Sequence, residues 1–295
     1  MTEMVLGVRS SAWSKKGTLG EQLKMIAAHG FKFINVIFDP MQSNAERKEA
    51  VQVFNDLGLY SGQMGVDVSS YTSKAGPESW KLWVDMGKRK VDFQAEMGGK
   101  QIVMVAGRYS TDYPWHNAWV DSVRSMQTVC DYAAQADQYV VLEYEPEIHY
   151  VTNTYEGTLT YLTHVDRDNF MINIDIGHMN CMQTPYRAVH LLRQLIPPRH
   201  ITDNDGTEHL CGPICTGTTD IAKWMEVLAP FVEETCAKIG EVPSAAIEFG
   251  AADPGAEIER IKAHLKSIGV NLPLRLYIDR RLGGRVVGSA TRSDA

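Results

Sequence analysis

The chain has 295 residues, of which 44% are hydrophobic and 22% are charged, and its formal net charge is −7. These values describe an ordinary globular protein with a sizeable core, built as one large α/β domain or as two small ones. The acidic balance and the lack of a Lys/Arg cluster argue against a nucleic-acid-binding protein. No apolar run reaches the roughly 18 residues that a membrane-spanning helix needs.

The cysteines and the N-terminus bear on the cellular compartment. Five cysteines stand at irregular spacing: Cys130, Cys181, Cys211, Cys215 and Cys236. An odd number in a large chain is typical of a reduced protein, and the N-terminal segment MTEMVLGVRSS has no basic region followed by a long apolar core. We therefore expect a cytoplasmic protein. Cys211 and Cys215 are treated as loop thiols, because no second Cys or His pair follows at zinc-finger spacing.

Apolar strand-like segments and helical patterns alternate along the whole chain. Strands are predicted at residues 4–10, 31–38, 59–66, 101–106, 139–143, 170–174, 199–203 and 244–249. Helices are predicted at residues 18–30, 43–57, 77–97, 119–136, 155–164, 186–195, 221–237 and 258–268. The first helix opens with a capping-box pattern of Thr18 and Glu21. The continuous apolar run QIVMVA at 101–106 suits a parallel strand that is covered on both faces.

This alternation predicts right-handed βαβ units and a parallel sheet. Eight such units within about 270 residues fit a closed (β/α)₈ TIM barrel, a single domain over residues 1–272. A doubly wound open sheet is the alternative, but no GxGxxG motif follows the first strand. The pattern stops after residue 272, so we expect residues 273–295 to form an irregular C-terminal extension, either a flexible tail or an oligomer arm.

The segment FMINIDIGHMN, residues 170–180, ends a predicted strand with ligand-type residues. Asp175 stands at the strand tip, Gly177 permits an unusual turn, and His178 follows. Asp175 and His178 would then lie on the same rim of a barrel. The simpler interpretation is that Asp175 caps the next helix and that His178 has no special role.

Three other strands end in similar residues, which favours a metal site. Catalytic groups of barrel enzymes lie at the C-terminal ends of the strands. Here these ends carry Glu143, Asp175, His200 and Glu248. Alone, each could be an ion-paired acid, a helix cap or a buried histidine. Together, three neighbouring carboxylates would repel one another unless a cation joined them, and mixed O/N ligation suits Mn²⁺, Mg²⁺ or Co²⁺, with Zn²⁺ as a further candidate.

The order of these residues resembles the xylose isomerase-like barrel superfamily. The likeness rests on Glu after VVL, on DxxHMN, on a His in the next strand and on Glu in AAIEFG, and it covers residues 4–270. The superfamily holds sugar isomerases and epimerases, inosose dehydratases and abasic-site endonucleases. The likeness to tagatose-epimerase-like members implies one divalent metal, Mn²⁺ foremost, on Glu143, Asp175, His200 and Glu248. It also implies a substrate contact for His178.

The chain departs from this pattern in two places. The epimerases commonly have an arginine about six residues after the histidine ligand, whereas no arginine occurs here between Arg199 and Arg260. Asp203, Asp205 or His209 could replace that substrate contact. The segment LEYEPEIHY also offers Glu145 and Glu147 beside Glu143. Glu145 would point to the same face, as a substrate-binding residue or as the ligand itself if the strand runs longer.

Two enzymatic hypotheses follow from the resemblance. The first is an isomerase or epimerase of a ketose or related polyol, in which Glu143 and Glu248 move a proton through a metal-bound enediolate. The second is a metal-dependent dehydratase or lyase acting on a keto-cyclitol or oxidised sugar, with Asp203, His209 or His149 as the acid at the leaving group.

Other readings of the barrel are weaker. An abasic-site endonuclease needs further metal ligands and a basic face, which the acidic balance disfavours. A non-catalytic binding barrel would be favoured if the purified protein held no metal, or if removal of Glu248 left ligand binding unchanged. We expect a small sugar or cyclitol as the partner, without nucleic acid or membrane, and a homo-oligomer is compatible with the tail. The substrate is expected to be unphosphorylated, because basic residues are scarce in the loops after strands seven and eight.

Overall fold

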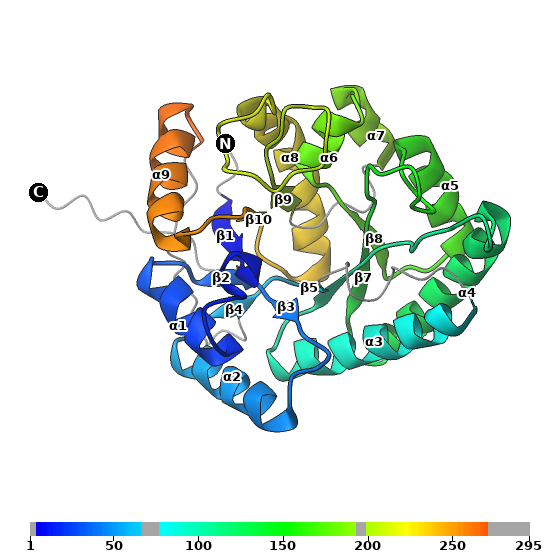
Figure 1. The fold of residues 1–295 in the computed structure, drawn as a ribbon, viewed down its shortest axis with the longest axis horizontal. Helices are drawn as coiled ribbons and strands as arrows, with labels where there is room; N and C mark the ends of the chain where they lie inside the picture. The colour runs from blue at the N-terminus through cyan, green and yellow to red at the C-terminus, as the bar shows by residue number, and fades with distance from the viewer. Residues whose placement is uncertain (1–3, 67–76, 193–198, 271–295) are drawn as a thin grey trace, which may run out of the picture.

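The computed structural model describes residues 4–66, 77–192 and 199–270 and confirms the predicted barrel. Parallel strands lie in the middle and helices surround them (Figure 1). The strands are β1 Val5–Arg9, β2 Phe33–Asn35, β3 Ile37–Phe38, β4 Tyr60–Ser61, β5 Gln63–Val66, β6 Gln101–Met104, β7 Tyr139–Glu143, β8 Phe170–Asn173, β9 Arg199–Ile201 and β10 Ser244–Ile247. The predicted extension 273–295 and residues 193–195 of the predicted seventh helix lie outside the described residues.

The helices follow the predicted order. They are α1 Leu19–Ala28, α2 Asn44–Asp56, α3 Pro77–Glu96, α4 Trp115–Ala134, α5 Tyr155–Val165, α6 Ile176–Cys181, α7 Val189–Leu192, α8 Ile221–Ile239 and α9 Pro254–Ser267, with 3₁₀ turns η1 Ser10–Trp13 and η3 Tyr186–Ala188. The capping box of Thr18 and Glu21 is present at α1. Two helices begin four residues earlier than predicted, because Pro114 precedes α4 and Pro254 occupies the first turn of α9, positions that favour helix starts.

Ten strand segments form the eight strands of the barrel, which are called staves below. The predicted second strand is divided at Val36 into β2 and β3, and the third is divided at Gly62 into β4 and β5. The first halves, β2 and β4, belong to a sheet of order β4-β2-β1-β10-β9, and the second halves, β3 and β5, belong to a sheet of order β3-β5-β6-β7-β8. The two divided staves therefore connect the two sheets on one side of the barrel. On the other side, an isolated parallel bridge between Asp175 and His200 closes the barrel.

Gly62 shows why the third stave is interrupted. A Cβ atom at this position would collide with the Phe33 ring and with the Asn35 side chain. The glycine therefore leaves room for Asn35, whose Oδ1 accepts from the Gln63 amide at 3.0 Å and whose Nδ2 reaches His200. The division of the stave thus directs an amide side chain towards the candidate site.

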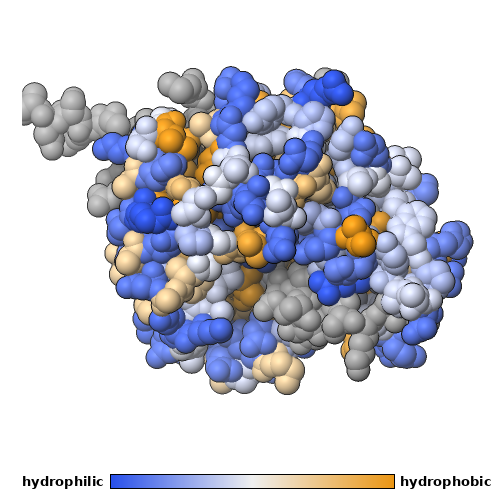
Figure 2. All heavy atoms as spheres, turned by 45° about the horizontal axis from the view of Figure 1, so that its top comes forward, coloured by the Kyte–Doolittle hydropathy of each residue, from blue (hydrophilic) through white to orange (hydrophobic). Residues whose placement is uncertain are grey.

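The core and the surface are those of a globular protein. All four residues of β6 are buried, as expected for a parallel strand covered on both faces. On the face shown in Figure 2, hydrophilic residues predominate and hydrophobic ones are scattered. Among the described residues, no helix is long and apolar enough to cross a membrane.

Lys90 on α3 is a fully buried lysine beneath the barrel mouth. Its ammonium donates to the carbonyl of Val103. Burial lowers the pKa of Lys90 to about 7, helped by the charge of Arg9 and opposed by that of Glu143. Because the ordinary pKa is 10.5, the unfolded chain holds the proton more tightly than the folded protein between these values.

We expect this difference to make stability depend on pH. The free energy of unfolding should rise with pH between 7 and 10.5, because over this range Lys90 takes up a proton when the chain unfolds. The resulting stabilisation is complete above the unfolded pKa and is lost as the pH falls through the folded pKa. Lys90→Met should remove about 2 to 3 kcal/mol of the rise between about pH 7 and 9.5, as measured by urea unfolding at both pH values. Lys81→Met, exposed on the same helix, should leave the rise intact. An equal rise in wild type and Lys90→Met would contradict the account.

Candidate metal centre and active site

The four predicted metal ligands converge at one end of the barrel. Glu143 ends β7, Asp175 follows β8, His200 lies in β9, and Glu248 follows β10. Each offers a ligand atom, and these atoms all lie within 4.8 Å of one another. The Nδ1 atom of His200 is 2.6 Å from Oε1 of Glu143, 3.5 Å from Oε2 of Glu248 and 4.0 Å from Oδ2 of Asp175. The convergence follows from the parallel staves, which end at the same mouth.

Asp175 both caps a helix and points a free oxygen at this cluster. Its Oδ1 accepts from the amides of Gly177 at 2.8 Å and His178 at 3.2 Å, and from the hydroxyl of Thr202. Its Oδ2 is buried and has no hydrogen-bond partner among the described residues. A buried carboxylate oxygen without a partner is costly, and a cation between it and Nδ1 of His200 would remove the cost.

The charge of the cluster also suits a divalent cation. Arg9, at the end of β1, forms an ion pair with Glu248. Three carboxylates and one guanidinium leave a net charge of −2 when His200 is neutral. An oxygen-rich set with one imidazole is the donor chemistry of Mn²⁺ or Mg²⁺ sites. The residues present therefore fit a divalent metal.

Two asparagines orient the imidazole of His200. Asn173 donates to Oε1 of Glu143 at 2.7 Å and lies 3.0 Å from Nδ1 of His200, while Asn35 lies 3.1 Å from Nε2. Burial opposes ionisation of both Glu143 and His200. Their mutual attraction outweighs it, so the pKa of Glu143 falls below its usual range and the pKa of His200 rises. The attraction between the two groups thus favours the charged form of each.

A second polar group adjoins the first. His178 donates from Nδ1 to the carbonyl of Tyr144 at 3.0 Å, because a carbonyl only accepts. Its Nε2 lies 2.8 Å from Nε2 of His209. The other ring nitrogen of His209 lies 3.4 Å from both Glu145 and Glu147. Charged His209 donating from both nitrogens satisfies the whole chain of contacts.

The pKa values agree with this assignment. Burial alone would lower the pKa of His209, but hydrogen bonds with Cys211 and Glu147 and the charge of Glu145 raise it to about 12. Burial raises the pKa of Glu145 to about 7, with Glu143 adding to the effect and the neighbouring histidines opposing it. The group therefore places a charged imidazolium and a carboxyl that titrates near neutrality beside the candidate metal ligands.

Asp203 lies apart from this group. Its carboxylate accepts from four backbone amides of the loop after β9, those of Cys215, Thr216, Gly217 and Thr219. It lines a separate shallow pocket rather than the main cavity. Its contacts hold in place the loop that carries His209 and Cys211.

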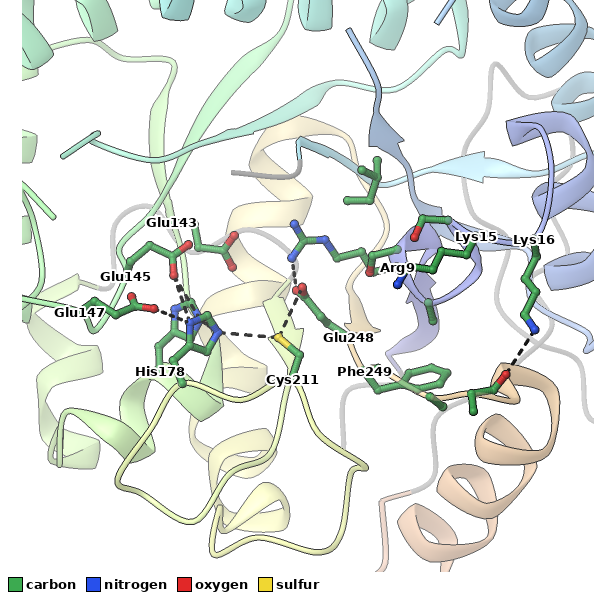
Figure 3. Close-up of a pocket in the computed structure, with 18 of the residues that line it drawn as sticks. Arg9, Lys15, Lys16, Glu143, Glu145, Glu147, His178, Cys211, Glu248 and Phe249 are labelled. Carbon is green, nitrogen blue, oxygen red and sulfur yellow. Dashed lines mark hydrogen bonds and ion pairs between the residues drawn. The ribbon is translucent and has the colours of Figure 1, made fainter. Parts of the chain in front are cut away.

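The main cavity, of about 770 Å³, opens over both groups (Figure 3). Glu143, Glu145, Glu147, His178 and Glu248 line one part of it. The sequence did not single out several further lining residues. These are Arg9, Lys15, Lys16 and Arg108, and Cys211, set aside as a loop thiol, also lines the cavity. Arg9 stands at the end of the first strand and could have been found there, whereas the others lie in loops whose positions no local pattern fixes.

The comparisons with known proteins agree with the fold. Residues 23–268 match the family model described as xylose isomerase-like TIM barrel. The chain belongs to this family. The resemblance inferred from the four strand ends is thereby confirmed.

Similar proteins include several sugar epimerases. L-ribulose 3-epimerase of Methylomonas sp. (strain DH-1) is 27% identical over 183 residues, which span 59% of this chain and 62% of that protein. The E. coli 3-keto-D-glucoside 4-epimerase has a TM-score of 0.72 at 19% identity, covering 90% of this chain and 100% of the other. An AP endonuclease of family 2 from Brucella melitensis has a TM-score of 0.69 at 10% identity, covering 88% and 99%. Both of these solved structures share the fold of this chain.

The unpaired oxygen of Asp175 generates a test of metal binding. Asp175→Asn keeps the helix cap but removes a charge, so we expect Mn²⁺ affinity at neutral pH to fall by at least about 100-fold. Calorimetric titration of metal-free protein measures the change. Glu226→Gln, on the exposed face of α8, is the matched control and should bind like wild type. Unaltered affinity in both Asp175→Asn and Glu248→Gln would contradict the assignment.

Thr202 provides a finer test of the same site. Its hydroxyl donates to Oδ1 of Asp175 and so orients the other oxygen towards the cluster. Thr202→Val should weaken Mn²⁺ binding by about 10- to 100-fold, since groups behind metal ligands have effects of this size. Thr202→Ser should restore binding because it keeps the hydroxyl. Equal binding by the Val and Ser variants would show that this hydrogen bond does not orient a ligand.

Proposed function

We propose that the protein is a divalent-metal-dependent isomerase or epimerase of a ketose or related polyol. The observation that carries the proposal is the convergence of Glu143, Asp175, His200 and Glu248, with the unpaired oxygen of Asp175 directed at the others. Family membership and the similarity to an L-ribulose 3-epimerase support a sugar substrate.

The proposed metal site binds Mn²⁺ foremost, on these four side chains. When bound, the cation polarises a carbonyl and its neighbouring hydroxyl, which makes the intervening C–H bond acidic. The protein itself must then supply a base on each side of that carbon. Glu143 and Glu248 come from separate staves and both face the cavity. One carboxylate removes the proton, and the other, after taking up a proton from solvent, donates it as a carboxylic acid to the opposite face of the same carbon.

Arg9 and Asn173 hold these two carboxylates in position. Arg9 pairs with Glu248, and Asn173 donates to Oε1 of Glu143 at 2.7 Å. A fixed base loses little orientational freedom in the transition state, which favours transfer along a defined path. Each of these acids thus has a positioning partner on a different stave.

The polar group beside the metal ligands is proposed to bind substrate hydroxyls. His178 and His209 offer a linked pair of ring nitrogens, and Glu145 offers a buried carboxylate on the same side. The charged His209 takes the place of the arginine that the related epimerases carry after the histidine ligand. Asp203 acts indirectly, by holding the loop of His209.

A dehydratase or lyase is the second candidate function. The observation that favours it is the proton-bearing His209 next to the proposed metal ligands, because an elimination needs an acid at the leaving group. The two functions share the first proton abstraction and differ in the fate of the intermediate. A keto-cyclitol or oxidised sugar would be the substrate in this case.

A screen in heavy water separates the two candidates. Manganese-loaded protein is incubated with ketoses and keto-cyclitols in D₂O, and the products are followed by NMR. We expect one deuterium at the epimerised carbon without loss of water. A dehydrated product would support the second function instead, and no exchange with any ketose or cyclitol would contradict both.

Variants of the proposed bases test the same mechanism. Glu143→Gln and Glu248→Gln should each lower kcat by about 10²- to 10⁴-fold, the usual contribution of a positioned acid or base. Glu226→Gln should retain full activity, because it lies on the exposed surface of α8. Retained activity in either Gln variant that still binds metal would contradict its role as a base.

A further inference from the structure

The main cavity has one part that contains all of its carboxylates and another part that contains its two lysines. The first part is formed by the end of β7 and the residues after it, with Glu143, Glu145 and Glu147, and by Glu248 after β10. The other part is formed by residues 11–16, after β1, and residues 249–252, after β10. It contains two lysines and two serines but no acid. The serines are Ser11 and Ser14.

The two lysines are not neutralised by carboxylates. Lys16 donates to the carbonyl of Ala252 at 3.3 Å, which leaves other ammonium hydrogens available. Lys15 forms no ion pair with any residue that the structure describes. In Figure 3 the Lys15 side chain extends from its loop towards Arg9 and Glu248, whereas Lys16 turns towards Ala252. Lys15 is thus exposed to solvent and lines the cavity.

Arg9 differs from the lysines because Glu248 already neutralises it. The positive charge available to a ligand in this part thus comes from Lys15 and Lys16. The cavity volume of about 770 Å³ lies within the range of about 300–1,000 Å³ typical of small-molecule sites. A substrate can therefore extend from the metal ligands into the lysine-lined part.

We propose that this part of the cavity is an anion subsite, which selects ketoses that carry a terminal phosphate or carboxylate. Lys15 is the principal contact, and Lys16, Ser11 and Ser14 add hydrogen-bond donors. The inference rests on the proposed function and specifies its substrate class. It departs from the unphosphorylated substrate expected from the sequence, because the cations come from the loop after β1 rather than from the loops after β9 and β10.

A matched set of ligands tests the subsite by binding alone. D-Fructose, D-fructose 6-phosphate and D-fructuronate share one carbon chain and differ at the terminal carbon. Their affinities for the manganese-loaded protein are measured by calorimetry. We expect at least one anionic ligand to bind about tenfold more tightly than D-fructose, as for a charge-assisted hydrogen bond. The anion with the larger preference identifies the source as phosphate or carboxylate.

Variants show whether the lysines cause this preference. Lys15→Gln should remove most of it and Lys15→Glu should reverse it, while the affinity for D-fructose stays unchanged. Lys223→Gln, on α8, is the control and should keep the wild-type preference. Higher salt should weaken only the anionic ligands, because exposed charges are screened. Equal binding of all three ligands, no binding of any, or a preference that survives Lys15→Glu would overturn the proposal.

The same ligands separate this inference from the proposed function. If an anionic ketose is turned over, Lys15→Gln should raise its KM and leave kcat unchanged, as expected for a contact made equally in substrate and transition state. Tight, lysine-dependent binding without deuterium exchange would support the subsite and count against the epimerase. Deuterium exchange on neutral ketoses, without any preference for anionic ligands, would support the epimerase and count against the anion subsite.

Discussion

The arrangement at the barrel mouth depends on the repulsion among buried carboxylates and on the positive charge that relieves it. Glu143, Asp175 and Glu248 are delivered to one place by separate staves, and burial makes their shared negative charge costly. Arg9 and His200 offset part of this cost. One oxygen of Asp175 has no hydrogen-bond partner among the described residues, and it marks the place of the proposed cation.

A few specialised residues allow the barrel to bring these side chains close together. Gly62 interrupts a stave and leaves room for Asn35, which reaches His200. Gly177 plays a similar part, because a Cβ there would collide with the side chains of Thr202 and Asn204. The start of α6 can therefore approach the residues after β9 closely. These two close approaches fix the side chains on either side of the seam that the Asp175–His200 bridge closes.

Much of this arrangement can be predicted from the sequence. The periodicity of apolar residues predicts the strands, and the C-terminal ends of these strands lie at the mouth of the barrel. Glu143, Asp175, His200 and Glu248 lie at such ends, and the structure brings them together. The predicted helix cap is present at Asp175, since one of its oxygens caps α6 while the other faces the cluster. A single residue can satisfy two patterns because its two oxygens face different neighbours.

The remaining features depend on loops and on long-range contacts, which local patterns do not encode. Asp203 and His209 belong to the same polar loop. The carboxylate of Asp203 nevertheless binds backbone amides, whereas the imidazole of His209 lines the cavity. Lys15 is an ordinary polar loop residue until the barrel closes and places the loop after β1 beside the residues after β10. The interruption of the third stave at Gly62 likewise reflects the space that Asn35 occupies.

The central claim is that four side chains from four staves share one ion. A crystal structure of the manganese-loaded protein, with anomalous diffraction collected at the manganese edge, tests it most directly. The account predicts a single strong anomalous peak with Glu143, Asp175, His200 and Glu248 as its protein ligands, and Oδ2 as the ligand atom of Asp175. A peak elsewhere, or no peak together with an Asp175 oxygen that turns away from the other three side chains, would contradict it.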